Sequence, residues 1–159
     1  MIFGLALHTT TEVLSLAIAR LDEPVEEQVG EGDLNNRSLL CLKQQSWQLG
    51  RELSTQLHLL LAEFMVSYNW SDLGFIAIAK GVGSFTGTRI GIVLARTLGE
   101  QLAIPVYAIG CDEILQRSQA LQVPQSLGQS LLSIAQEQWA QSQYPHWSEA
   151  LPYIPNSSE

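Results

Sequence analysis

A helix with a nearly flat face is the feature that most constrains this fold. After a strongly apolar run at residues 73–79, small residues recur at every fourth position, namely Gly87, Gly91, Ala95 and Gly99. Residues four apart lie on the same side of an α-helix. Each glycine inside a helix costs about 1 kcal/mol relative to alanine. We therefore expect another backbone to approach this face closely, with the helix held between a sheet and a second apolar surface.

A glycine-rich turn joins the apolar run to this helix. Gly81 and Gly83 suit a sharp turn because glycine accepts positive φ and close backbone approach. Ser84 or Thr86 can accept a hydrogen bond from the first amides of the helix, and such a helix N-terminus can hold an anion. Arg89 adds positive charge nearby. These five residues are a candidate anion or nucleotide site, although a solvated surface explains the charged side chain equally well.

Two strand-like runs, residues 2–7 and 13–19, come before this junction and predict an antiparallel hairpin. The turn between them contains Thr9 and Thr10. Threonines in a turn usually bond their own backbone, and the alternative is a phosphate loop that adds both residues to the anion site. Residues 20–36 are acidic and predict an exposed connection, and residues 38–43 are expected to complete a third strand.

From Trp47 the apolar period becomes helical, and two apolar sets make the helix apolar on nearly every side. The second set is Leu59, Ala62, Met65 and Val66. A helix of this kind is buried in its own domain or covered by another chain. We interpret it as a partner interface together with the small face of the later helix, through Leu53, Leu57, Leu60, Leu61, Phe64, Gly87 and Gly91. The alternative is a core helix.

The rest of the chain completes an α/β pattern. Residues 73–79 predict a central strand covered on both faces, and residues 105–109 predict another strand. Helices are expected from about residue 110 to 121 and from 127 to 139, followed by an irregular strap at 147–155. We divide the chain into an N-terminal lobe at residues 1–122 and a reduced C-terminal segment at 123–159.

Composition limits the function classes. The chain has 159 residues, of which 46% are hydrophobic and 15% charged, so it is expected to fold as one unit with a real core. A net charge of −8 without a basic block argues against tight nucleic-acid binding by this chain alone. Cys41 and Cys111 form no disulfide or zinc pattern. The lack of a signal sequence or an apolar span predicts a cytoplasmic protein with no membrane contact.

The usual catalytic motifs do not occur. The glycine pattern is neither a dinucleotide fingerprint nor a Walker loop, and Ser84 lies outside a nucleophile elbow. His8, His58 and His146 are scattered without metal-ligand spacing. We therefore predict no catalytic residue and no metal ligand, and whether the chain is an enzyme is left open.

Residues 81–91, Gly-Val-Gly-Ser-Phe-Thr-Gly-Thr-Arg-Ile-Gly, resemble the Gly-Pro-Gly-Ser-Phe-Thr-Gly-x-Arg-x-Gly signature of the bacterial TsaB (YeaZ) family. This family is related to the Gcp/Kae glycoprotease-like proteins. Residues 5–12 are similar to the family's opening Leu-Ala-Ile-Asp-Thr-Ser-Thr-Glu, and residues 51–65 are similar to its first helix. The resemblance covers roughly residues 2–115.

The resemblance implies an actin/Hsp70-like lobe of the ribonuclease H type, with a mixed sheet flanked by helices. Family members usually continue into a second lobe, and in this chain we expect that lobe to be reduced. The resemblance also implies a role in forming N6-threonylcarbamoyladenosine in tRNAs that read codons beginning with A. The chain would be a non-catalytic scaffold that pairs with the TsaD transferase, and the resulting complex would recruit the TsaE ATPase. The chain would bind no cofactor itself, since ATP and a divalent metal belong to the partner subunits, and it would reach tRNA only through the complex.

Two positions depart from the family pattern. His8 replaces the usual Asp, and Val82 replaces the proline of the signature; both weaken a claim of nucleotide hydrolysis. Three alternatives stay open: a glycoprotease-like peptidase, a residual nucleotide-binding lobe, and a diverged homodimer that no longer pairs with the transferase. Family members also form homodimers through the helices that follow the first strands.

Overall fold

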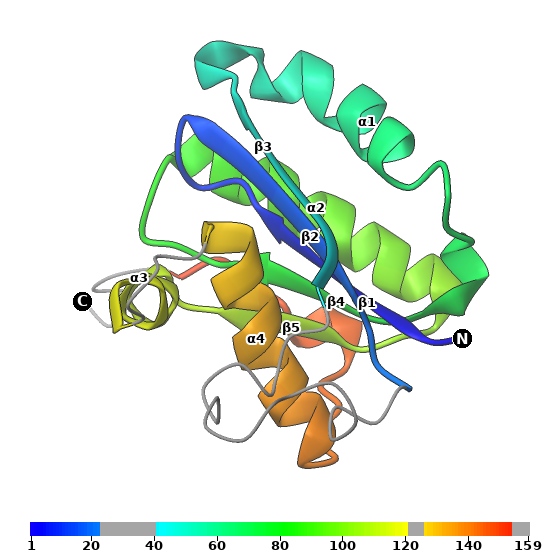
Figure 1. Ribbon diagram of the computed structural model, residues 1–159. Helices are drawn as coiled ribbons and strands as arrows, with labels where there is room; N and C mark the ends of the chain where they lie inside the picture. The colour runs from blue at the N-terminus through cyan, green and yellow to red at the C-terminus, as the bar shows by residue number, and fades with distance from the viewer. Residues whose placement is uncertain (23–40, 121–125, 154–159) are drawn as a thin grey trace.

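A five-stranded mixed sheet forms the centre of the molecule (Figure 1). The structure is a computed structural model that describes residues 1–22, 41–120 and 126–153. The strands lie in the order β3-β2-β1-β4-β5. Strand β2 runs antiparallel to both β3 and β1, while β4 runs parallel to both β1 and β5. Their bounds are β1 Phe3–His8, β2 Val13–Arg20, β3 Cys41–Gln48, β4 Leu73–Ala79 and β5 Val106–Ile109.

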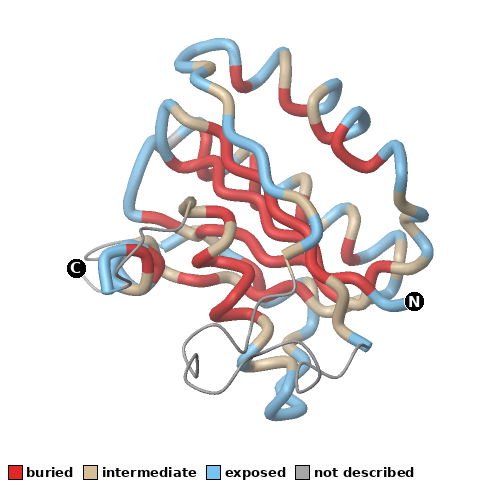
Figure 2. The backbone as a smooth tube through the Cα atoms, viewed as in Figure 1, coloured by how far each residue is buried: buried red, intermediate tan, exposed pale blue. Residues whose placement is uncertain are grey.

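Helices cover both faces of this sheet (Figure 1). On one face lie α1 Leu53–Phe64 and α2 Phe85–Leu102, and on the other lie α3 Cys111–Ala120 and α4 Leu127–Ala140. Short 3-10 helices complete the described part: η3 Gly50–Glu52, η4 Trp70–Asp72 and η5 Trp147–Glu149. Strands β1, β2 and β4 are almost continuously buried between the two helical layers, whereas the edge strand β3 is mostly exposed, as Figure 2 shows. The mixed α/β architecture predicted from the sequence is therefore confirmed.

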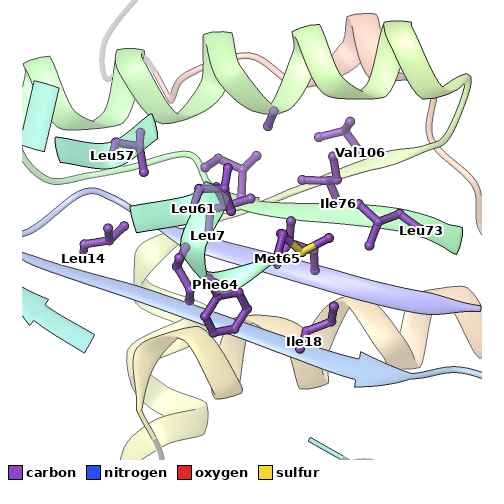
Figure 3. Close-up of a cluster of buried hydrophobic side chains, with 14 of the residues drawn as sticks. Leu7, Leu14, Ile18, Leu57, Leu61, Phe64, Met65, Leu73, Ile76 and Val106 are labelled. Atoms are coloured by element: carbon purple, nitrogen blue, oxygen red, sulfur yellow. The ribbon is translucent and has the colours of Figure 1, made fainter. Parts of the chain in front are cut away.

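The two sides of the sheet have different side chains. The α1–α2 side is filled by large aliphatic residues, such as Leu7, Leu14 and Ile76, which meet the inner face of α1 (Figure 3). The α4 side carries small residues on β1, β2 and β4, among them Ala6, Ala17 and Ala77. Small side chains let a helix approach the sheet closely, so α4 becomes part of the same packed unit as the sheet.

The start of α4 is fixed to β2 by a buried hydrogen bond. The Gly128 amide donates to Ser15 Oγ at 2.9 Å, and a side chain on Gly128 would collide with the same serine. Ser126 and Gln129 form a capping box at this end of the helix. The proposed division between residues 122 and 123 falls among residues 121–125, which lie outside the described residues.

The prediction that the helical period begins at Trp47 is wrong. Trp47 lies in β3, opposite Leu14 of β2, and α1 begins only at Leu53. Gly50, with φ of +54°, separates the strand from the helix. The third strand was expected at residues 38–43; β3 runs instead from Cys41 to Gln48, and residues 38–40 are not described. Pairing with β2 decides this segment, because its sequence is polar and only weakly alternating.

Candidate functional site

The small face of α2 packs against the turn between β1 and β2. A side chain on Gly87 would collide with the carbonyl oxygen of Thr9, and one on Gly91 would collide with Thr9 Oγ1 and Ile78. The Thr9 hydroxyl also donates to the carbonyl oxygen of Gly87 at 2.8 Å. The predicted close approach of another backbone is thus present, and that backbone belongs to the same chain. Gly87 and Gly91, predicted as partner contacts, lie inside the molecule instead.

The glycine turn is fixed to the same β1–β2 turn. The Ser84 amide donates to the Thr10 carbonyl oxygen at 2.6 Å, and a Cβ on Gly83 would lie 2.5 Å from that oxygen. Ser84 Oγ caps α2 by accepting from the Gly87 amide at 3.3 Å, as the sequence predicted. Gly81 adopts a φ of +114°, which favours glycine. The two turns therefore hold each other in place.

Most of the candidate anion-site residues lie at this junction, but the hydroxyls of Thr9, Thr10 and Ser84 are engaged in contacts within the protein. Thr9 and Thr10 are buried, and the Thr10 hydroxyl lies 3.2 Å from Cys111 Sγ. Thr86 and Arg89 lie on the exposed side of α2. The two threonine hydroxyls bond to residues far along the chain, and not to the backbone of their own turn as expected from the sequence. Anion binding here stays a prediction.

His8 is the one histidine in the described chain that is buried, at 2% exposure. It ends β1 opposite Ser15 and its Nδ1 has no hydrogen-bond partner. Burial lowers the pKa of His8 to about 4, so the imidazole is neutral at pH 7. The sequence marked His8 only as a departure from a family pattern, because nothing in a single sequence shows how deeply one histidine is buried.

The predicted interface stripe on α1 points into the molecule. Four of its residues are buried in the core, namely Leu53, Leu57, Leu61 and Phe64, and Leu60 is half-buried. Figure 3 shows Leu57, Leu61 and Phe64 among the core side chains. Their side chains pack in the core against the sheet, so the core-helix alternative describes them. The exposed apolar residues of this layer are others: Leu59 at 61%, Val66 at 81% and Val93 of α2 at 63% exposure.

A hollow of about 340 Å³ lies beside Val93 on α2. It is lined by Arg96 on the same helix and by Trp147 of η5. The Arg96 guanidinium lies 6.0 Å from the centre of the Trp147 ring, at the limit of a cation–π contact. Within residues 1–22, 41–120 and 126–153, no three His, Cys, Asp or Glu side chains gather where they would hold a metal ion.

Comparison with known protein families shows to which family the chain belongs. The model of the TsaD family, described as tRNA N6-adenosine threonylcarbamoyltransferase, matches residues 48–127. This segment is half of the chain and contains α1, the glycine turn, α2 and α3. The chain belongs to this family. The glycine turn that organises the site is therefore also the centre of the family match.

Two TsaB proteins are among the curated relatives to which this chain is similar. It is 52% identical over 44 residues to the tRNA threonylcarbamoyladenosine biosynthesis protein TsaB of Bacillus subtilis and 46% identical over 44 residues to TsaB of Buchnera aphidicola. Each match spans 28% of this chain, but only 19% and 21% of the two relatives. The resemblance to the TsaB (YeaZ) family is confirmed.

Solved structures of similar shape agree with the fold. YeaZ from Pseudomonas aeruginosa superposes with a TM-score of 0.73 at 20% identity, covering 97% of this chain and 100% of that one. Thermus thermophilus RuvC reaches a TM-score of 0.57 at 12% identity, covering 91% of this chain and 99% of that one. At these identities the likeness concerns the fold, which is the actin-like arrangement that the sequence predicted. None of the helices in the described ranges is long and apolar enough to cross a bilayer.

Proposed function

We propose that this TsaD-family chain is a non-catalytic subunit in the synthesis of N6-threonylcarbamoyladenosine in tRNA, and that it pairs with the TsaD transferase. The observation that carries this proposal is the exposure of apolar side chains on α1, in the turn directly after it, and on α2. These residues, Leu59, Val66 and Val93, define what we call the α1–α2 surface. All three lie inside the segment matched by the family model.

Energetics favour a partner over this surface. Burying an exposed aliphatic side chain contributes about 1.5–3 kcal/mol, so three such residues supply a useful part of a pairing energy. The inner side chains of α1 are buried in the core, so only the outer side of the α1–α2 layer is exposed to a partner protein. The neighbouring hollow, lined by Arg96 and Trp147, adds a concave element beside Val93.

The chemistry of the glycine turn supports a non-catalytic role for this chain. The hydroxyls of Thr9 and Thr10 bond within the protein, and His8 is neutral and buried where an ionised group would be needed to hold a cation. The partner subunits, including the TsaE ATPase, would therefore bind ATP and a divalent metal. This chain would contact tRNA only as part of the complex. We place this work in the cytoplasm.

A reconstituted reaction tests the proposal. The chain is combined with TsaD and TsaE of the same organism, threonylcarbamoyl donor and tRNA, and the modified nucleoside is measured by mass spectrometry. We expect modification to depend on this chain and to fall at least tenfold in Leu59→Glu. Leu115→Glu is the matched control, because Leu115 is also exposed but lies on α3, on the other face of the sheet. Modification that does not need the chain contradicts the proposal, and so does an equal loss in both variants.

A further inference from the structure

A second hollow lies at the edge of the sheet where β1, β4 and β5 begin. Its volume is about 490 Å³. It is lined by the segments Met1–Ile2, Ser71–Gly74 and Ala103–Pro105, together with Trp139 of α4 and Tyr144. The glycine turn follows the other end of β4, so this hollow is separate from the junction and from the α1–α2 surface. Its lining combines aliphatic and aromatic side chains with the carboxylate residue Asp72.

Two aromatic rings make a corner in this lining. The ring centres of Trp139 and Tyr144 are 5.0 Å apart, and their planes meet at 65°. Trp139 is fixed from behind, since it also contacts Phe75 and lies against the backbone of Gly74. Tyr144 is 56% exposed and stands toward solvent. An aromatic ring with an open face attracts a cation placed over it, which is how proteins hold organic cations.

The charges at the rim of the hollow also favour a cation. Asp72 is half-buried, and in the described part of the chain it has no ion-pair partner. The other charge at the rim is the amino group of Met1, which is paired with Asp22 at 3.8 Å. The whole chain carries a net charge of −8. A cation is thus attracted both by the rim and by the overall field.

We propose that this hollow receives an arginine side chain from a partner protein. The methylene stem of arginine covers apolar surface while its head stays polar, and the planar, weakly hydrated guanidinium stacks on aromatic rings and pairs with carboxylates. An acidic guest would meet Asp72 with like charge, and a purely apolar guest would leave that carboxylate desolvated without a partner. The assignment does not depend on the pairing function of the α1–α2 surface.

The test is a titration of the isotope-labelled full chain with the peptide acetyl-Gly-Arg-Gly-amide, followed by NMR. The matched probe contains citrulline, which keeps the shape of arginine but carries no charge. We expect the arginine peptide to shift the amide signals of residues 71–74, Ile104 and Tyr144, with binding at least threefold tighter than for citrulline. Equal binding of the two peptides, or shifts centred elsewhere, overturns the proposal.

Two variants separate the local carboxylate from the overall charge. Asp72→Asn is expected to weaken binding of the arginine peptide about threefold, the usual scale of an exposed ion pair. Asp112→Asn removes the same charge from the exposed start of α3 and is expected to leave binding unchanged. Unfolding curves confirm that both variants are folded. Equal weakening in the two variants, or none in Asp72→Asn, means that the hollow does not recognise arginine.

Discussion

At the scale of single residues, His8 is where the fold departs most from ordinary chemistry. Its imidazole is buried against the small-residue side of the sheet, with Nδ1 unpaired. A single sequence cannot predict this state, because a histidine at the end of a strand is as often exposed as buried. The hydroxyl-rich turn that follows was predictable from residue type, but the partners of Thr9 and Thr10 were not, because their hydroxyls reach Gly87 and Cys111 far along the chain.

The burial of His8 predicts that the protein loses stability in mild acid. The pKa is 6.5 in the unfolded chain and about 4 in the folded protein. Between these values only the unfolded chain takes up the proton, so the free energy of unfolding falls as pH decreases, by about 1.4 kcal/mol per pH unit. The effect is absent above pH 6.5. Asp22, whose pKa is lowered to about 2, changes the free energy of unfolding only in more acidic solution.

Urea unfolding at pH 7 and pH 5 measures this effect. The wild type should lose about 2 kcal/mol more than His8→Gln over this interval, since the variant keeps the carboxylates and lacks the titrating imidazole. The comparison of pH slopes is unaffected by any loss of stability common to both pH values. Parallel pH dependence of the two proteins would show that His8 is not kept neutral by the fold.

At the scale of elements, the close approach of another backbone to the small face of α2 was predictable from spacing alone. Glycines every four residues indicated a close approach, and the structure supplies it through Thr9. The spacing did not say whose backbone approaches. The same ambiguity affected α1, because Leu53, Leu57 and Leu61 look alike whether they face a sheet or a partner. The beginning of α1 was missed because β3 is a polar edge strand, held by pairing and not by its own pattern.

Gly91→Ala tests the packing of α2. Alanine favours a helix by about 1 kcal/mol relative to glycine, but here its methyl group meets Thr9 and Ile78. We expect the clash to dominate and the free energy of unfolding to fall by about 2 kcal/mol. Thr97→Ala, on the exposed side of the same helix, should be neutral or slightly stabilising. A Gly91→Ala protein as stable as the wild type would mean that α2 does not sit this close to the turn.

At the scale of the whole molecule, the two helical layers differ in role. The α3–α4 layer closes one side of the sheet, where small residues allow tight packing. The α1–α2 layer closes the other side and leaves Leu59, Val66 and Val93 in solvent. The fold class and the central position of β4 were predictable from apolar runs and their order. The exposed residues were not, since only the packed structure distinguishes the outer side of α1 from the inner side.

The most direct test of the account is the mass of the complex formed with TsaD from the same organism. The two proteins are mixed, separated on a sizing column and weighed by light scattering. We predict a one-to-one complex for the wild type and for Leu115→Glu, and separate elution for Leu59→Glu. If the wild-type chain elutes alone or as a homodimer in the presence of TsaD, or if Leu59→Glu still forms the complex, the α1–α2 surface is not the site at which this chain pairs with the transferase.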